Sequence, residues 1–248
     1  MSGHSKWASI KHKKAAVDAK RGKIFTKIIR EITVAAKIGG GEPANNPRLR
    51  TAIDTAKTAN MPADNIERAI KKGTGEAEGV TYEEIVYEGY GPEGVAIYVQ
   101  CLTDNKNRTS SEIRTIFSKK NGNMAGAGSV AWLFEKKGLI VVEESVAKED
   151  QLMEIVLNAG ADDLSKSGTK FEILTDPHNF EAVKKALDDA KVTYELASLQ
   201  MIPKNLTAVS ANQARAILAL VDALEDHDDV QNVYTNCDFP PDVMKELQ

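Results

Sequence analysis

The sequence is poor in the residues that build disulfide frameworks and cysteine metal sites. It holds two cysteines in 248 residues, Cys101 and Cys237, which are too few and too far apart for either. We interpret both as buried thiols of a protein from a reducing compartment. No apolar stretch approaches a membrane span, and the polar, basic N-terminus lacks the apolar region of a secretory signal. We therefore expect a cytoplasmic protein with no membrane partner.

Sequence patterns typical of enzymes are missing as well. The glycine-rich stretch Gly122–Gly128 lacks the lysine of a phosphate-binding loop, and it precedes an expected strand instead of a helix. His227 stands among Asp226, Asp228 and Asp229, an arrangement that we interpret as an exposed acidic helix end and not as a metal site. The sequence predicts no enzymatic activity, no cofactor and no metal site.

Positive charge, in contrast, is concentrated near the N-terminus. Residues 1–72 carry 16 Lys and Arg against six Asp and Glu, whereas residues 73–248 carry 16 against 30. Between Ser2 and Arg30 the only acid is Asp18. The cations of this stretch are Lys6, Lys11, Lys13, Lys14, Lys20, Arg21, Lys23, Lys27 and Arg30. Such a density of cations indicates a phosphate backbone as partner, because neutralising phosphates releases condensed counterions. The alternative interpretation is a solvated basic helical surface.

Trp7 is the one aromatic residue that stands among these lysines. It suits stacking on a nucleic-acid base, and it equally suits anchoring the N-terminal arm on a helical bundle. The surrounding lysines suit phosphate contact better than base reading. We expect them to supply affinity without sequence choice.

The periodicity of apolar residues predicts a basic helical domain over residues 1–79. A Lys- and Ala-rich helix is expected near Ser9–Lys20, and Gly22 is expected to interrupt it before a better helix, Ile24–Ile38. That second helix places its apolar residues on one face and its cations on the opposite face. Two further helices are expected from Pro47 and over Pro62–Lys72.

Strand patterns alternate with helices from Tyr82 onward. The runs Tyr82–Tyr90 and Val95–Thr103 predict a hairpin, in which we interpret Glu83, Glu84 and Glu88 as the exposed alternate positions. Residues 138–202 spell βαββαβ, the ferredoxin-like order. A strand at Ser129–Glu135 is expected before them. A helix at residues 211–225 and a strand at residues 230–237 are expected after them, to complete the sheet that begins at Tyr82.

The fold class that follows is α+β, with an N-terminal helical bundle plus two α/β (ferredoxin-like) domains. We expect the second domain to comprise residues 81–137 and 204–238, and the third, residues 138–203, to be inserted into it.

Five segments closely resemble the YebC/PmpR family. They are GHSKWASIKHKKAAVDAKRGKIFTK (Gly3–Lys27), MPADNIERAIKKG (Met61–Gly73), YEGYGPEGVA (Tyr87–Ala96), LTDNKNRT (Leu102–Thr109) and GSVAWLF (Gly128–Phe134). The resemblance implies three domains and a cytoplasmic regulator of gene expression without known enzymatic chemistry. It departs at Ala125, where relatives often carry a glycine. The basic stretch is intact, so the binding role carries over to its cations.

Two functions fit these observations. One is a DNA-binding transcriptional regulator, although the sequence shows no obvious base-reading helix. The alternative is a ribosome-associated translation factor or translational activator that binds ribosomal RNA, which suits a Lys-rich surface of low sequence selectivity. The expected partner is nucleic acid, either duplex DNA or ribosomal RNA, and the acidic domains would face the ribosome or other proteins. A scaffold that joins proteins through its acidic domains is a further alternative.

Overall fold

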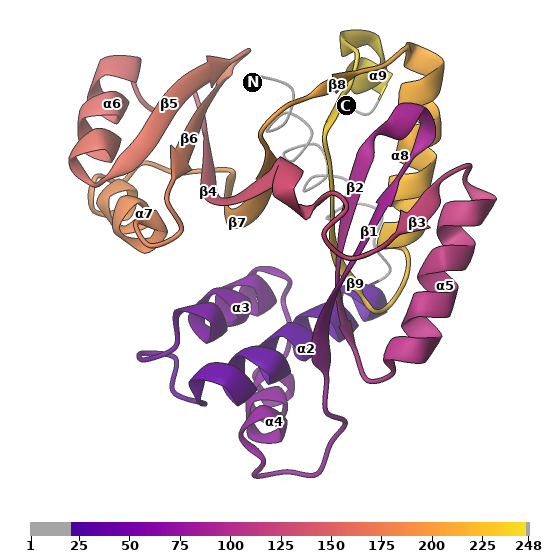
Figure 1. The fold of residues 1–248 in the computed structure, drawn as a ribbon. Helices are drawn as coiled ribbons and strands as arrows, with labels where there is room; N and C mark the ends of the chain where they lie inside the picture. The colour runs from indigo at the N-terminus through magenta and orange to yellow at the C-terminus, as the bar shows by residue number, and fades with distance from the viewer. Residues whose placement is uncertain (1–20, 247–248) are drawn as a thin grey trace. The chain divides into compact units, whose positions relative to one another are not determined.

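The computed structural model describes residues 21–246 (Figure 1). Its described part divides into two compact units. The first unit comprises residues 21–130 and 216–233, and the second comprises residues 131–215 and 234–246. Each is described by itself below.

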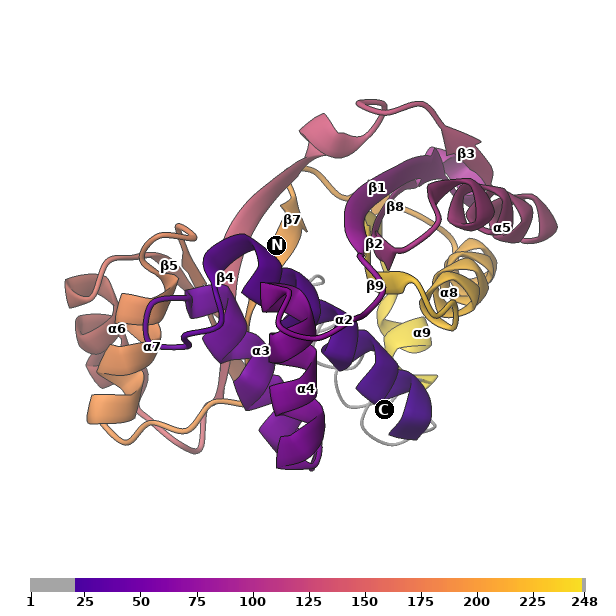
Figure 2. The ribbon, with the colours of Figure 1, turned by 90° about the horizontal axis from the view of Figure 1, so that it is seen from below.

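Three helices form the N-terminal part of the first unit (Figures 1 and 2). They are α2 (Arg21–Gly39), α3 (Pro47–Thr58) and α4 (Ala63–Thr74). Asn46 begins α3, because its side chain accepts a hydrogen bond from the Leu49 N–H and Pro47 follows with its φ already fixed. The helices predicted over Ile24–Ile38, from Pro47 and over Pro62–Lys72 are confirmed, and the helix predicted near Ser9–Lys20 lies outside the described residues. Gly22, however, lies inside α2, which begins one residue before it.

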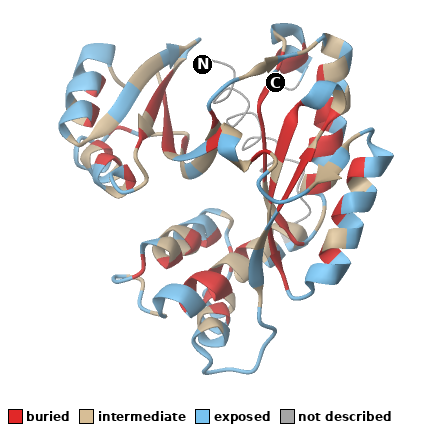
Figure 3. Ribbon diagram, in the orientation of Figure 1, coloured by how far each residue is buried: buried red, intermediate tan, exposed pale blue. Residues whose placement is uncertain are grey.

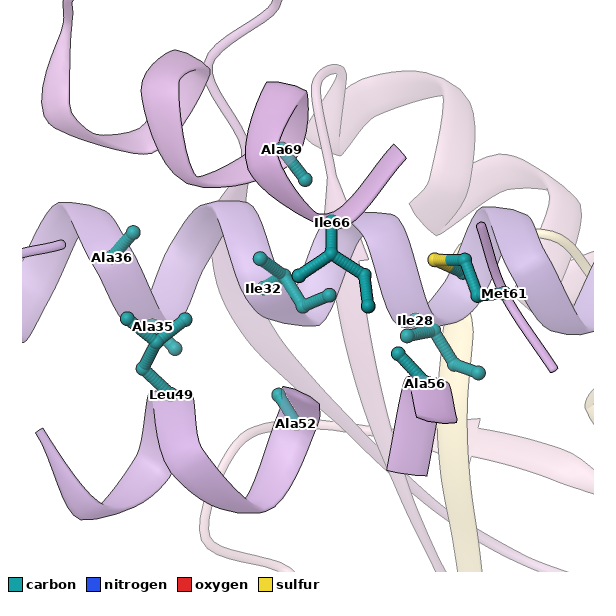
Figure 4. Packing of buried hydrophobic residues seen from close by; sticks show 10 residues of the cluster. All are labelled: Ile28, Ile32, Ala35, Ala36, Leu49, Ala52, Ala56, Met61, Ile66 and Ala69. Carbon is teal, nitrogen blue, oxygen red and sulfur yellow. The ribbon is translucent and has the colours of Figure 1, made fainter. Parts of the chain in front are cut away.

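These helices pack around a core of small and branched apolar residues (Figure 4). Ile32 of α2, Leu49 of α3 and Ile66 of α4 are all buried in this core. Gly73 allows α2 and α4 to approach closely, because a Cβ atom there would stand 2.4 Å from the Thr33 carbonyl oxygen. One face of α2 is therefore committed to the core, and its other face carries the cations.

A four-stranded sheet completes the first unit. Strand β1 pairs antiparallel with β2, from Glu83 opposite Thr103 to Tyr90 opposite Ala96. The order β3-β1-β2-β9 confirms that the last long strand completes the sheet begun near Tyr82. The elements are β1 (Glu83–Tyr90), η1 (Pro92–Gly94), β2 (Ala96–Thr103), α5 (Lys106–Lys119), β3 (Asn123–Ala125), most of α8 (Ala211–Glu225) and most of β9 (Val230–Thr235). Buried residues follow these strands and the inner faces of the helices (Figure 3).

The second unit holds the predicted ferredoxin-like arrangement. Its sheet has the order β5-β6-β4-β7 with antiparallel neighbours, which is the order that a βαββαβ chain adopts in this fold. Helices α6 and α7 bury Leu152, Val156 and Leu187 in the same core as Ile140 and Ile173 of the sheet. The elements are β4 (Phe134–Glu143), α6 (Glu149–Asn158), β5 (Ala161–Ser167), β6 (Lys170–Thr175), α7 (Phe180–Asp189) and β7 (Leu196–Pro203).

Short elements complete the second unit. After β7 the chain forms β8 (Thr207–Ala208), which pairs in parallel with β10 (Cys237–Asp238), and α9 (Pro241–Glu246) ends the described part of the chain. Strands β4 to β7 lie between β3 and β9 in the sequence. The domain boundaries given above stay predictions.

The segment before β4 differs from its prediction. Residues 131–133 form the 3-10 turn η2 (Ala131–Leu133), and β4 then runs without interruption through Gly138. The sequence suggested two strands separated near this glycine. Its actual role is close packing, since a Cβ atom there would lie 2.3 Å from Thr175 Oγ1 and 2.5 Å from Phe180 Cδ2.

Candidate nucleic-acid interface

The predicted nucleic-acid-binding residues divide into two groups. Lys6, Trp7, Lys11, Lys13, Lys14 and Lys20 lie outside the described residues. Arg21 is the first residue of α2, and its side chain is not described. The side chains of Lys23, Lys27 and Arg30 are described, and the first unit shows what each of them contacts.

Lys23, Lys27 and Arg30 face the C-terminal end of α8. Their spacing of four and three residues places them on one side of α2. Lys23 Nζ lies 2.6 Å from Asp226 Oδ1 and donates to the Asp226 carbonyl oxygen at 3.0 Å, while Lys27 Nζ donates to the Glu225 carbonyl oxygen at 2.7 Å. Cations here neutralise the partial negative charge that a helix carries at its C-terminus.

Arg30 continues this contact into a buried cluster. Its guanidinium donates to Asp229 Oδ1, to the Asp228 carbonyl oxygen at 2.8 Å and to the Leu102 carbonyl oxygen at 3.2 Å. It also stands over the Tyr82 ring, 5.2 Å from the centroid. Arg30 therefore joins α2 to strand β2 and to the residues directly before β9.

Asp229 is the acceptor at the centre of the cluster, and its side chain is 2% exposed. Arg108 donates to its Oδ2 at 2.7 Å and Thr109 does so at 2.6 Å. Burial by itself would raise the pKa of Asp229, but the hydrogen bonds from Thr109, Arg108 and Arg30 outweigh it and lower that pKa to about 2. The carboxylate is charged at neutral pH and is held from both sides.

The burial of Asp229 and of Glu88 corrects two interpretations made from the sequence. Asp226 and Asp228 are exposed, as an acidic helix end should be, but Asp229 is buried. Glu88 is buried too, because its carboxylate accepts from the backbone N–H groups of Gly128 at 2.7 Å and Val130 at 2.6 Å. Charged side chains at these positions serve as internal acceptors for loops that the strand pattern does not reveal.

The segment Leu102–Thr109 supplies much of the cluster. Asn105 caps α5 by accepting from the Arg108 N–H at 3.0 Å. The Thr103 and Thr109 hydroxyls are 2.7 Å apart, and Thr109 also reaches Asp229. In the sequence this segment is recognisable only as a family motif, and its role as a donor of contacts to Asp229 is not. Its signal was a run of cap and donor residues placed between a strand and a helix.

A metal does not fit this cluster. Ligand atoms of Glu112, His227 and Asp229 lie within 4.8 Å of one another. Both Asp229 oxygens already accept from Arg30, Arg108 and Thr109, and His227 Nδ1 accepts from the Asp229 N–H at 3.1 Å. The arrangement is that of a hydrogen-bond and ion-pair network.

Several other cations of α3 and α4 are also compensated. The guanidinium of Arg48 has one nitrogen 2.6 Å from Glu31 Oε1 and another 2.6 Å from Glu84 Oε1. Lys71 Nζ lies 2.6 Å from Glu67 Oε1. Lys57 and Lys72 are exposed and have no such partner among the described residues. Arg50 and Arg68 donate to neutral oxygens of Pro43 and Asn65, so α3 and α4 combine ion-paired cations with cations that have no acidic partner among the described residues.

Both cysteines are buried, as expected. Burial raises the pKa of Cys101 and of Cys237 to about 12, so neither thiol ionises at neutral pH. A membrane-crossing helix would need length and apolarity together, and no helix within residues 21–246 combines them.

The fold and the charge pattern define a class: a multidomain α+β protein with a cation-rich N-terminal part, residues 1–72, and an acidic remainder, residues 73–248. Comparison with known proteins is more specific. Residues 5–76 match the N-terminal domain of the TACO1/YebC protein, and residues 82–237 match the TACO1/YebC second and third domain. The chain belongs to the TACO1/YebC family.

Relatives of the same length carry regulatory names. The chain is 58% identical over 247 residues to a "Probable transcriptional regulatory protein" of Geobacter sulfurreducens, with all of both chains covered. It is 60% identical over 239 residues to one of Koribacter versatilis, with 96% of each chain covered. Its fold is similar to the crystal structure of a conserved hypothetical protein from Aquifex aeolicus, with a TM-score of 0.84 and 48% identity, over 94% of this chain and 97% of that one.

Proposed function

We propose that this protein is a cytoplasmic, nucleic-acid-binding regulator of gene expression that grips its target through its basic N-terminal residues. The observation that carries the proposal is the charge distribution, since Ser2–Arg30 holds nine cations and a single acid within a chain whose net charge is −4. The regulatory names of the relatives support it. They also favour a regulator over an enzyme.

From the contacts of α2 we infer two different roles for these nine cations. We assign phosphate contact to Lys6, Lys11, Lys13, Lys14, Lys20 and Arg21, with Trp7 beside them. Lys23, Lys27 and Arg30 hold α2 against the end of α8. They contribute to binding by fixing the direction in which α2 leads back to the N-terminal cations.

Duplex DNA is the first candidate target, because the relatives are named as transcriptional regulators. Binding of this kind has a steep salt dependence for any sequence, and a regulator must in addition prefer one site. The acidic body would stay off the DNA and face other proteins.

RNA, in particular ribosomal RNA, is the second candidate, and the exposed residues of α4 favour it. A base-reading helix presents Arg, Asn or Gln to the groove. Within α4, Arg68 donates to its neighbour Asn65 at 2.5 Å and Lys71 pairs with Glu67. A lysine-rich surface without such a reader suits recognition of RNA by shape and backbone.

The proposal is tested by reversing charge where phosphate contact is assigned. A full-length variant with Lys11, Lys13, Lys14 and Lys20 changed to Glu should lose affinity for duplex DNA and RNA by at least about 100-fold at low salt, since four phosphate contacts are removed. The matched control changes Lys148, Lys184, Lys191 and Lys204 of the second unit to Glu and should bind as the wild type does. Equal binding by both variants contradicts the proposal.

A further inference from the structure

A second concentration of positive charge lies on α5, far along the sequence from the N-terminal cations. Arg114, Lys119 and Lys120 are exposed, and their side chains have no hydrogen-bond or ion-pair partner among the described residues. Between Ile113 and Leu133 the sequence contains no acid at all. No neighbouring residue in this stretch of the sequence therefore offsets the positive charge.

The two halves of α5 differ in this respect. Lys106 at its start is paired with Glu83, and Arg108 is held by Asp104 and Asp229. The free cations are confined to the second half and to the residue that follows the helix. Lysines at a helix C-terminus also favour the helix itself. That effect does not account for Arg114, which stands mid-helix.

Short polar side chains surround these cations. At 100° per residue, Ser118, Thr115 and Lys119 fall within about 140° of Arg114 on the helix surface, and all are exposed. The opposite face buries Ile113 and Phe117 against the sheet. The exposed face therefore combines charge with hydroxyl groups and carries no large apolar side chain.

The loop after α5 extends this surface. Asn121 and Asn123 are exposed, and their side-chain amides have no hydrogen-bond partner among the described residues. A Cβ atom at Gly126 or Gly128 would meet nothing within 4 Å, so a ligand has room to approach the backbone. The Glu88 carboxylate holds this loop in place through the Gly128 N–H.

We propose that the second half of α5 and the loop that follows it, residues 111–128, form a second nucleic-acid contact that binds the backbone of structured RNA. A protein partner would require an apolar centre, which this surface lacks. Arg and Lys bind phosphates. The free amides of Asn121 and Asn123 both donate and accept. The Thr115 and Ser118 hydroxyls donate to the Ser111 and Arg114 carbonyl oxygens and can still accept. Such groups match the ribose 2′-OH of RNA, whereas a DNA backbone offers acceptors alone.

This inference rests on the proposed function and adds a second surface to it. Because the cations of the helix's first half are paired internally, α5 cannot read bases from its N-terminal end as a major-groove recognition helix does. The contact raises affinity and orients the first unit on RNA.

The test uses the full-length protein and a short RNA duplex, with a DNA duplex of the same sequence for comparison. Arg114, Lys119 and Lys120 are changed to Gln, which removes charge but keeps helix propensity. Affinity for the RNA duplex should fall at least about 10-fold, and the slope of log K against log salt should become shallower by about two to three. The matched control changes Lys148, Lys191 and Lys204 to Gln and should equal the wild type in both quantities.

Unchanged RNA affinity in the α5 variant, with the thermal midpoint preserved, overturns the inference. So does a loss limited to the DNA duplex. If the N-terminal charge reversals still abolish binding in that case, the proposed function survives and the α5 surface alone is wrong. If neither set of changes weakens binding, both ideas fail.

Discussion

Replacing Asp229 with Asn tests the buried cluster that joins the basic helix α2 to the sheet. The substitution keeps the size and polarity of the side chain and removes its negative charge. Arg30 and Arg108 then face an amide in place of a carboxylate, and the Arg30 side chain is 12% exposed. Solvent therefore gives Arg30 little compensation.

The expected loss follows from the pKa of Asp229. Its value of about 2, against an ordinary 3.8, corresponds to about 2.5 kcal/mol of stability at neutral pH, at roughly 1.4 kcal/mol per pKa unit. Leaving an arginine unpaired adds to the loss, and removing one partner of a buried ion pair costs about 3–5 kcal/mol in well-buried cases. Because Arg108 is 41% exposed, we expect about 2–4 kcal/mol in total.

The pH dependence has a definite sign. A carboxyl group whose pKa is lowered by folding stabilises the folded state above its unfolded pKa, and this contribution disappears as the pH falls from about 4 toward 2. The Asn variant has no such group. The difference in free energy of unfolding between wild type and variant should therefore be constant from pH 5 to 7 and should shrink below pH 4.

Urea unfolding followed by circular dichroism at pH 7, 5 and 3 measures this difference. Asp228→Asn is the matched control, because Asp228 is exposed and only its backbone carbonyl takes part in the cluster. That variant should lie within about 0.5 kcal/mol of the wild type. If Asp229→Asn is as stable as Asp228→Asn at pH 7, the cluster does not hold the helix to the sheet and our reasoning is refuted.

Substitutions at Gly73, with Gly22 as its control, and at Glu172 test close packing in the first unit and a buried carboxyl group in the second. Gly73→Ala should destabilise the helical part by about 1–3 kcal/mol, because its Cβ atom would stand 2.4 Å from the Thr33 carbonyl oxygen. In the control Gly22→Ala the Cβ atom meets nothing within 4 Å, and this variant should be neutral or stabilised by up to about 1 kcal/mol. Equal melting temperatures of the two variants would contradict the close approach of α2 and α4. Burial raises the pKa of Glu172 to about 7 against an ordinary 4.5. Above pH 7 the folded protein must therefore hold a buried charge, which lowers its stability. Glu172→Gln removes that charge and should raise the free energy of unfolding by up to about 3 kcal/mol at pH 8 and by much less at pH 5. A gain that does not depend on pH would show that Glu172 is ionised in the folded protein throughout this range.

Local signals in the sequence were sufficient for most of the fold. Pro47 after Asn46 marks the start of α3, and the alternation of strands and helices after residue 138 predicts the ferredoxin-like sheet that the structure shows. Caps and periodicity are properties of neighbouring residues, so one sequence carries them in full. Gly138 was misread because its close neighbours, Thr175 and Phe180, come from elements some 40 residues further along.

The candidate site was predictable in part, for a related reason. The run of cations between Ser2 and Arg30 is visible in the sequence itself. The partners of Arg30 are not, since Asp229 is 199 residues away from it. Whether a cation is free or paired depends on distant segments that the fold brings together. That is also why the paired and unpaired halves of α5 could not be told apart beforehand.

The central claim, that this chain holds nucleic acid through its N-terminal cations, is tested most directly by ultraviolet crosslinking in cells. Crosslinked peptides of the full-length protein would be identified by mass spectrometry, and the attached DNA and RNA would be sequenced. Our account predicts crosslinks within residues 1–21, with a second set at residues 111–128 on RNA. Crosslinks confined to the ferredoxin-like sheet of residues 134–203, or none above the level of a non-binding control protein, would contradict it.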